Sequence, residues 1–426
     1  MNQPFISKLS LRKFKCYNSL DLDLQSGVNI LYGVNGTGKT SILEAINIAA
    51  GSFFLNLSSV EKRNINLTDI RIEPKEGMLY PEYQFPVEIK AIGYILNKKT
   101  TWSRELNSIS GGTTMINAKE IAQLSSEAVE FVQNGEPKEL PIIAYFSTQR
   151  LFTQRRDSDK KPTGRFAGYY NALNDTNTRK HIQLWFKDAE YEQYQKRQTN
   201  PGFINIGLES IKDLILPYFE EWTRLYYYEP KSDTRLESGL YIVHKNGGII
   251  PEGLLSDGYR NFLWLFIEIA WRCYMLNPFL GKDAFSKTKG IVTIDEIDLH
   301  LHPKWQQKII SIFAEAFPSI QFVITTHSPI ILGSVKSNIL RLEGDKIETQ
   351  SSFYGLKPSY ILEVFMKIQE RLPQHRDIIN NYFKLINEGE GKKEEALEMR
   401  KILEEMIAKD DPLFTEADTL IDFLSY

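Results

Sequence analysis

The chain has 426 residues, of which 42% are hydrophobic, enough for two or three domain-sized units with buried cores. Its net charge of −3 does not predict that the chain as a whole binds nucleic acid. The longest apolar helix is interrupted by Glu268 and Arg272, and the N-terminus lacks a signal-peptide core, so we expect a cytoplasmic protein without a membrane role. Cys16 and Cys273 lack metal-ligand spacing and are expected to be small core residues in a reducing compartment.

The first elements expected along the chain are strands. Residues 6–11 and 20–24 favour an antiparallel β layer with a turn between them. A third apolar run, residues 28–32, predicts a buried strand. It leads into GVNGTGKTS at residues 33–41, which fits the pattern G-x-x-x-x-G-K-[ST]. This strand and loop, followed by a helix at residues 41–50, form the context that the pattern requires.

The glycine-rich loop has the composition of a phosphate cradle. Its glycines let backbone N–H groups turn toward a polyphosphate, Lys39 supplies a point charge, and the Thr40 hydroxyl is a ligand for Mg²⁺. The dipole of the following helix favours the same anion. Phe14 and Tyr17 are expected either to stack on a nucleotide base or to join the core. The expected nucleotide-binding residues of the loop are Asn35, Gly36, Thr37, Gly38, Lys39, Thr40 and Ser41.

The middle of the chain predicts two α+β insertions, at about residues 51–140 and 160–250. Neither is long or heptad-patterned, which excludes coiled-coil arms. The elements expected in them are a hairpin at residues 87–95 and 101–106, helices at 121–132, 181–195 and 208–222, and strands at 226–228 and 240–243.

Gln149 follows another β-rich run, within FSTQR at residues 146–150. It is a candidate for a polar contact at the end of that strand, with Gln154 as a weaker rival and a solvated amide as the ordinary alternative. Residues 149–165 carry a net charge of +4. This run is either a solvated loop or a track for a phosphate backbone.

The sequence LSDGYRN at residues 255–261 precedes an apolar helix expected at residues 262–276. Ser256 is expected to cap that helix by satisfying its free amides. A capped helix N-terminus with a glycine also presents amides and a positive dipole to a phosphate. Ser256 and Gly258 are therefore candidate phosphate ligands across a dimer interface.

Two later strands end in residues that suit phosphate chemistry. Residues 291–294 form an apolar run that ends in Asp295 and Glu296, where Asp295 is expected to hold magnesium through water and Glu296 to act as general base for the attacking water. Residues 321–326 predict the next strand, which ends before His327. A histidine there can donate a hydrogen bond to charge that develops on the terminal phosphate.

After residue 342 the chain becomes helical and charged. It predicts a C-terminal helical lobe at residues 346–426 that either covers its own core or binds a partner. One helix, expected at residues 392–408 with Pro412 as a stop, carries five apolar side chains on one face: Ala396, Met399, Leu403, Met406 and Ile407.

Four motifs, GVNGTGKT, LSDGYRN, IVTIDEIDLHLHP and ITTHSP, occur in an order that resembles the ABC-type ATPase heads of the RecF, SMC and OLD class. The resemblance covers about residues 1–345. It implies an α/β P-loop NTPase head with a mixed central sheet and an antiparallel β layer. It also implies an ATP hydrolase in which two heads enclose two ATP molecules with Mg²⁺.

Individual roles follow from the same resemblance. Ser256 and Gly258 of one copy would face the phosphate loop of the other, and His302 takes the place of an interfacial aspartate. Asp295 would contact magnesium, and Gln149 would be the glutamine that senses magnesium and the γ-phosphate. Glu296 would be the catalytic base, and His327 would be the switch histidine.

The motif wording and the short helical tail resemble the PtuA-type ATPases of Septu and retron anti-phage systems. This resemblance implies a homodimer or higher homo-oligomer and a separate HNH-type nuclease that the ATPase holds in check. DNA or RNA is a further expected partner. The alternatives are a neighbouring defence ATPase such as that of PARIS, a RecF-like DNA-repair clamp, and a scaffold in which ATP is bound but scarcely hydrolysed.

Overall fold

The computed structural model divides the chain into two compact units, Met1–Leu356 and Lys357–Tyr426. Within the described part of the chain, no helix is long and apolar enough to span a bilayer. The structure describes residues 3–74, 80–151, 162–174, 178–230, 237–344, 346–350, 352–368 and 371–424.

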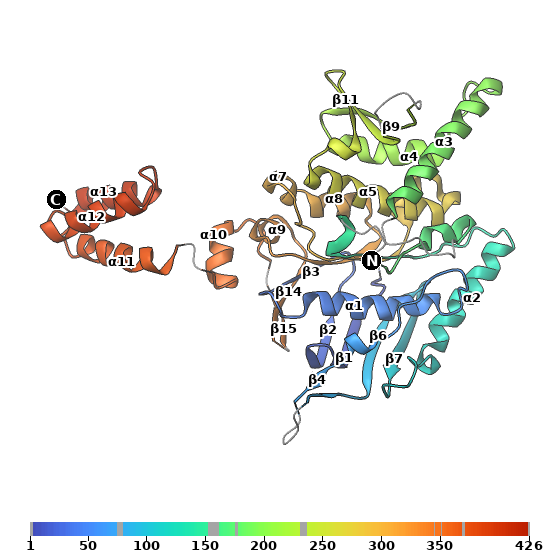
Figure 1. The fold of residues 1–426 in the computed structure, drawn as a ribbon, viewed down its shortest axis with the longest axis horizontal. Helices are drawn as coiled ribbons and strands as arrows, with labels where there is room; N and C mark the ends of the chain where they lie inside the picture. Colours follow the sequence, from blue (N-terminus) through green and yellow to red (C-terminus); the bar gives the residue numbers. More distant parts are fainter. Residues whose placement is uncertain are drawn as a thin grey trace. The chain divides into compact units, whose positions relative to one another are not determined.

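A six-stranded mixed sheet forms the centre of the first unit (Figure 1). Its strands lie in the order β15-β14-β3-β13-β12-β8, and only β15 runs antiparallel to its neighbour. The five parallel strands are mostly buried and apolar, as is typical of a sheet covered on both faces. The strands are β3 Val28–Tyr32, β8 Ile142–Phe146, β12 Gly290–Ile294, β13 Ile320–Thr325, β14 Asn338–Glu343 and β15 Lys346–Gln350.

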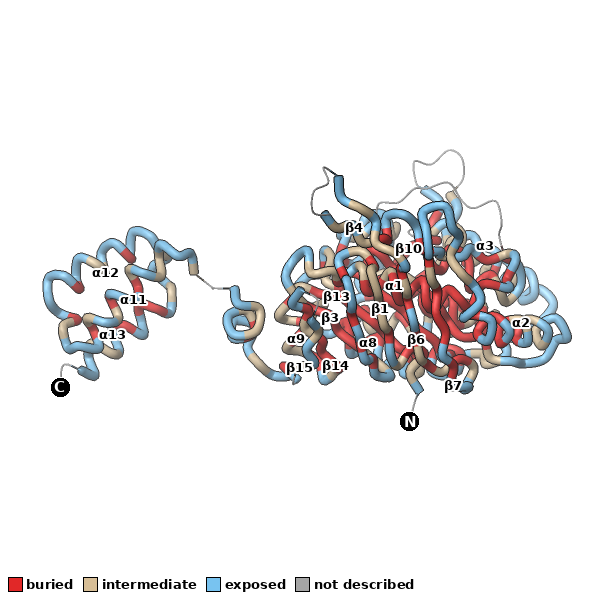
Figure 2. Tube along the Cα trace, turned by 90° about the horizontal axis from the view of Figure 1, so that it is seen from below, coloured by how far each residue is buried: buried red, intermediate tan, exposed pale blue. Residues whose placement is uncertain are grey.

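A second, antiparallel sheet has the order β2-β1-β6-β7. Helix α1, Lys39–Ala50, packs between the two sheets and is buried over most of its length (Figures 1 and 2). The indole Nε1 of Trp102 donates to Ala49 O at 2.9 Å and so fixes the helix to this sheet. The strands are β1 Lys8–Phe14, β2 Tyr17–Asp23, β6 Val87–Ile95 and β7 Lys98–Leu106.

The β6–β7 hairpin corrects one expectation from the sequence. The sequence predicts it within an insertion, whereas β6 pairs along β1 and completes the antiparallel layer. The rest of the segment adds helix α2, Lys119–Gln133, and the short strands β4, Ile72–Glu73, and β5, Glu82–Tyr83.

Helices cover the other face of the central sheet, and a small sheet lies beyond them (Figure 1). Helix α5, Asp257–Leu276, starts five residues earlier than expected and contributes mostly buried side chains. The helix predicted at residues 208–222 is too long, because Pro217 interrupts it and Trp222 already begins β9. The elements are α3 Arg179–Thr199, α4 Ile206–Ile215, α6 Ala284–Lys287, α7 Pro303–Gln306, α8 Ile309–Ala316, α9 Pro329–Ser334, β9 Trp222–Tyr228, β10 Gly239–His244 and β11 Ile249–Pro251.

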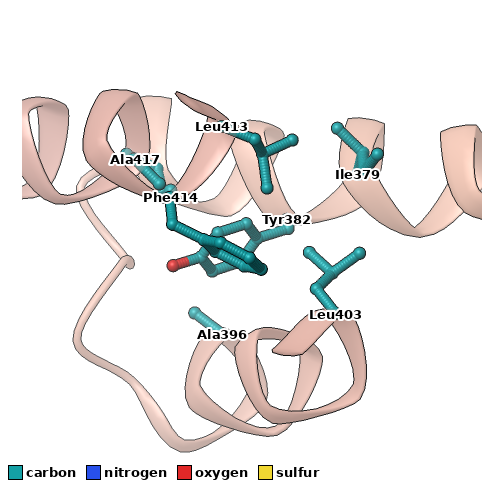
Figure 3. Close-up of a cluster of buried hydrophobic side chains, with 8 residues drawn as sticks. Ile379, Tyr382, Ala396, Leu403, Leu413, Phe414 and Ala417 are labelled. Atoms are coloured by element: carbon teal, nitrogen blue, oxygen red, sulfur yellow. The ribbon is translucent and has the colours of Figure 1, made fainter. Parts of the chain in front are cut away.

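The C-terminal unit has a small core of its own, made by α11, α12 and α13 (Figure 3). Ala396 and Leu403 of the predicted apolar face are fully buried, whereas Met406 is 38% exposed. The boundary lies after Leu356, because β15 pairs with β14 and belongs to the first unit. The helices are α10 Pro358–Tyr360, α11 Pro373–Asn387, α12 Glu394–Met406 and α13 Pro412–Leu424, with a π turn at Ile361–Phe365.

Candidate functional site

The glycine-rich loop connects β3 to α1 and depends on two left-handed glycines. Gly36 and Gly38 have φ values of 82° and 86°, which disfavour any residue with a side chain. A Cβ on Gly38 would lie 2.5 Å from the hydroxyl of Tyr17, and that hydroxyl donates to Thr37 O at 2.7 Å. The first residue of β2 therefore supports the loop from outside.

The burial of individual residues decides the expectations for Phe14, Tyr17 and the two cysteines. Phe14 and Tyr17 are 0% and 1% exposed, so they are core residues and do not offer a face to a base. Cys16, expected in the core, is exposed beside the loop, whereas Cys273 is buried as expected.

Lys39 lies inside the loop. Its side chain is nearly buried, and Nζ donates to Gly33 O at 2.9 Å and to Val34 O at 3.0 Å. Burial lowers the pKa of Lys39, and the carboxylate of Asp295 counteracts part of that effect. Gly38 caps α1 without a side-chain bond, so the first amides of the helix stay available to an anion. The loop therefore fits a polyphosphate with Lys39 as its counter-charge.

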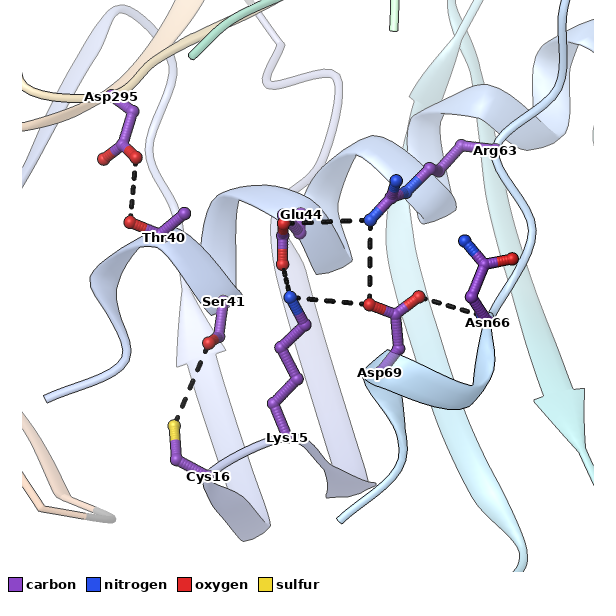
Figure 4. A network of polar contacts seen from close by, with 9 residues as sticks. All are labelled: Lys15, Cys16, Thr40, Ser41, Glu44, Arg63, Asn66, Asp69 and Asp295. Atoms are coloured by element: carbon purple, nitrogen blue, oxygen red, sulfur yellow. Dashed lines mark hydrogen bonds and ion pairs between the residues drawn. The ribbon is translucent and has the colours of Figure 1, made fainter. Parts of the chain in front are cut away.

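Asp295 follows β12 and meets two hydroxyl groups. Thr40 Oγ1 donates to Asp295 Oδ2 at 2.8 Å, although the two residues are 255 positions apart (Figure 4). Thr325, at the end of β13, donates to Asp295 Oδ1 at 2.6 Å. Hydroxyl and carboxylate oxygens are the ligands that Mg²⁺ prefers, and it usually takes only one or two from the protein. Among the described residues no cluster of three or more His, Cys, Asp or Glu side chains is placed to hold a metal.

Glu296 has a strained backbone, with φ at 46°. Its N–H donates to Thr325 Oγ1 at 2.7 Å, and its carbonyl accepts from Leu299 N at 3.0 Å. Its partly exposed carboxyl side chain lies at the carboxyl edge of the central sheet, one residue after Asp295. A carboxylate held at that point can accept a proton from a water molecule.

His327 follows β13 and is half-buried. Desolvation lowers its pKa, and the positive charge of Lys39 lowers it further. The imidazole is therefore neutral at pH 7 and has one N–H to donate. The adjacent Thr326 hydroxyl donates to Asp298 Oδ1 at 2.6 Å, which connects the ends of β13 and β12 a second time.

Ser256, Gly258 and His302 form a second group on the first unit. Ser256 caps α5 by its backbone position, but its exposed side chain makes no cap hydrogen bond, contrary to expectation. A Cβ on Gly258 would lie 2.2 Å from His300 O, so only glycine lets α5 pack there. His302 is exposed, and its Nδ1 accepts from Lys304 N at 3.3 Å. In the described part of the chain, no hydrogen bond or ion pair connects these three residues to the glycine-rich loop.

Gln149 lies in a short helix, Thr148–Leu151, directly after β8. Its side chain is exposed and its N–H donates to Ser147 Oγ at 3.1 Å, so its role toward magnesium stays a prediction. The rival Gln154 and most of the basic run, residues 152–161, lie outside the described residues.

Arg150, which the sequence indicates only as part of the basic run at residues 149–165, binds the backbone of the Asp295–Glu296 pair. Its guanidinium donates to Asp295 O at 2.7 Å, Glu296 O at 2.8 Å and Asn261 Oδ1 at 2.9 Å. Burial lowers the pKa of Arg150 to about 10, so it remains charged at neutral pH. Both Arg150 and Asn261 stand inside the quoted motifs FSTQR and LSDGYRN, but nothing in either motif indicates that they meet.

These features together define an ABC-type P-loop ATPase head. The loop strand β3 and the acidic strand β12 are separated by β13, which brings Lys39, Thr40, Asp295 and His327 to one edge of the sheet. The chain belongs to the family described as "AAA domain, putative AbiEii toxin, Type IV TA system", whose model matches residues 28–333.

The chain is similar to relatives that match nearly its whole length. "Retron Ec83 probable ATPase" of Escherichia coli is 26% identical and covers 96% of this chain and 85% of its own length. "Septu protein PtuA" of Bacillus thuringiensis is 27% identical and covers 96% of this chain and 95% of its own. They confirm the predicted resemblance to ABC-type ATPases of the PtuA kind.

Among solved structures, the SMC head domain of Pyrococcus furiosus, with an extended coiled coil and bound to the C-terminal domain of ScpA, has a TM-score of 0.47. It is 14% identical and covers 82% of this chain and 96% of its own.

Proposed function

We infer that this chain binds ATP with Mg²⁺, hydrolyses it as a dimer, and thereby controls a separate nuclease in anti-phage defence. One observation carries the catalytic part. Asp295 accepts two short hydrogen bonds, from the hydroxyl groups of Thr40 and Thr325. Lys39 is close enough to Asp295 to feel its charge, and Glu296 directly follows Asp295 in the chain. This arrangement supports metal-assisted phosphoryl transfer to water.

Each residue has a distinct task in the proposed reaction. Bound Mg²⁺ would neutralise charge on the β- and γ-phosphates, with Thr40 and Asp295 as its protein ligands. Lys39 would leave the carbonyls of Gly33 and Val34 and pair with the phosphates. Glu296 would accept the proton of the attacking water, and neutral His327 would donate a hydrogen bond to the γ-phosphate.

A second copy of the chain would complete the pocket. Ser256 lies at the exposed end of α5, and Leu254 beside it is 77% exposed. On the loop, Val34 is 64% exposed and Asn35 is also exposed. These surfaces support a dimer in which the Ser256 end of one copy covers the nucleotide of the other. His302 would lie at that interface as well.

The C-terminal unit is the candidate surface for the nuclease. Its core is small, and Leu397 on α12 and Phe423 on α13 are 58% and 76% exposed. Residues 371–424 contain 13 acidic and eight basic side chains, so a partner with a basic surface would be complementary. The resemblance to PtuA-type systems makes a small HNH nuclease our proposed partner.

The catalytic proposal is tested with Glu296→Gln. We expect ATP to bind as in the wild type, hydrolysis to fall by about a hundred- to ten-thousand-fold, and ATP-bound dimers to accumulate. Steady-state turnover and light scattering after size exclusion measure these effects. Glu315→Gln, an exposed change on α8, is the matched control and should have no effect. Unchanged turnover in Glu296→Gln would contradict the catalytic assignment.

The partner proposal is tested by the neighbouring reading frame and by co-purification. We expect a neighbouring frame to encode a small HNH protein that co-purifies with this chain, and Phe423→Glu to abolish co-purification while ATP binding persists. Glu416→Gln on the same helix is the control, since Glu416 is exposed and polar. If instead the chain alone binds DNA in an ATP-dependent manner with a steep salt dependence, the RecF-like alternative is favoured.

A further inference from the structure

Within one chain, Arg150 connects the N-terminal end of α5, where the LSDGYRN motif lies, to the backbone of Asp295 and Glu296. Its Nη1 and Nη2 atoms donate to the consecutive carbonyls of Asp295 and Glu296 at 2.7 and 2.8 Å. Its Nε donates to Asn261 Oδ1 at 2.9 Å, and Asn261 lies on the second turn of α5, three residues after Gly258. Nη1 also donates to Ser147 O at 2.9 Å.

Asn261 makes a second connection. Its Nδ2 donates to Leu299 O at 3.0 Å, and the residue is 2% exposed. Gly258, one turn earlier, packs directly against His300 O. The start of α5 therefore contacts residues 299–300 directly and residues 295–296 through Arg150.

The geometry makes this connection stiff. A guanidinium is a planar group with donors in a fixed fork, so two carbonyls bound to it cannot move independently. The peptide that it holds is the strained one, because Glu296 has φ at 46°. A displacement of α5 would therefore either move the Glu296 backbone or break its hydrogen bond to Arg150. It would not be absorbed by rotation of a flexible side chain.

We propose that Arg150 and Asn261 are positioning residues that couple the two nucleotide sites of the dimer. This proposal rests on the proposed function, in which the Ser256 end of α5 serves the partner's site while Glu296 serves the chain's own. Engagement of α5 by the partner's nucleotide moves Asn261, Arg150 follows, and the Glu296 carboxylate is brought into place. Each site then becomes active when the other is occupied.

Arg165 offers a matched comparison at the opposite end of α5. Its Nε donates to Leu276 O at 2.7 Å and its Nη2 donates to Lys138 O, so it connects α5 to a neighbouring segment through backbone carbonyls, as Arg150 does through the Asn261 side chain and the carbonyls of residues 295–296. It does not contact the Asp295–Glu296 peptide. A purely structural role for Arg150 would make Arg150→Gln and Arg165→Gln behave alike.

The test measures ATP hydrolysis against ATP concentration. We expect a Hill coefficient above 1 for the wild type and about 1 for Arg150→Gln and Asn261→Leu. The kcat of Arg150→Gln should fall about ten- to a hundred-fold, while the Kd for a fluorescent ATP analogue stays within about twofold. Arg150→Lys keeps the charge without the fork and covers the case in which Arg150→Gln does not fold. Arg165→Gln should keep the wild-type Hill coefficient and kcat.

Two outcomes would overturn the coupling: a wild-type Hill coefficient of about 1, or variants of Arg150 and Asn261 that match Arg165→Gln in every kinetic constant. Absence of hydrolysis in the wild type would instead contradict the proposed function. Hydrogen exchange separates the two cases because it needs only bound nucleotide. ATP should slow exchange at residues 295–301 in the wild type, and Asn261→Leu should lose that effect; equal slowing in both proteins refutes the coupling.

Discussion

Replacing Thr325 with valine isolates the hydroxyl that arranges the two acidic residues. Thr325 is fully buried, and its hydroxyl donates to Asp295 and accepts from the N–H of Glu296. Valine keeps the shape and removes both bonds. A hydrogen bond to a charged group contributes about 1.5–3 kcal/mol, and a buried N–H without a partner costs about 1–3 kcal/mol. The free energy of unfolding should therefore fall by about 3 kcal/mol or more.

The effect on catalysis follows from the same bond. If the hydrogen bond to Asp295 stabilises the transition state but not the ground state, its loss lowers kcat by about ten- to 150-fold. Steady-state hydrolysis and urea unfolding measure the two effects. Thr325→Ser keeps the hydroxyl and should retain most activity. Thr293→Val removes a buried hydroxyl that bonds Asn47 on α1, and it should lower stability without lowering kcat. A kcat for Thr325→Val within twofold of the wild type would refute the reasoning.

Three further predictions follow. Lys39→Ala should weaken ATP binding by at least about a hundredfold in a fluorescence titration, because the phosphates lose a counter-charge; Lys304→Ala, an exposed lysine, should bind normally. The folded state lowers the pKa of His327 below its usual 6.5, so the unfolded chain binds more protons there and the free energy of unfolding should fall as the pH drops below about 6.5. Thermal unfolding of His327→Gln should lack that part of the pH dependence. Identical pH profiles for the variant and the wild type would contradict this prediction. Phe414→Ala should destabilise the C-terminal core by about 3–5 kcal/mol and expose residues 371–424 to limited proteolysis, with ATP binding intact; resistance equal to the wild type would contradict the packing.

Sequence patterns were sufficient where the local signal and the tertiary environment agreed. The strand at Val28–Tyr32 is apolar except for Asn29 and is followed by a glycine, and its bounds match the prediction. The strand at Val87–Ile95 also matches, because it ends at a turn with positive φ at Leu96 and Asn97. The meeting of Thr40 with Asp295 follows from parallel strands whose carboxyl ends share one edge.

Other features depend on packing between distant segments. The pairing of β6 with β1 leaves no mark in either strand, because any apolar strand could take that edge. Arg150 and Asn261 are 111 residues apart, and each is an ordinary polar residue within its motif. Their contact exists only because α5 packs against β8. The side chain of Ser256 was expected to form a cap, but the helix begins without that bond.

The position of β3 in the sheet has a consequence for how the protein matures on the ribosome. Both neighbours of β3, β13 and β14, come from residues 320–343, and the buried Asn29 of β3 bonds Phe322 O and Asn338. Until those residues leave the ribosomal exit tunnel, β3 of the nascent chain, which precedes the glycine-rich loop, has no neighbouring strand to pair with. We therefore expect an incomplete chain to lack an ordered glycine-rich loop. A chain that terminates before residue 320 should therefore not form the nucleotide-binding loop.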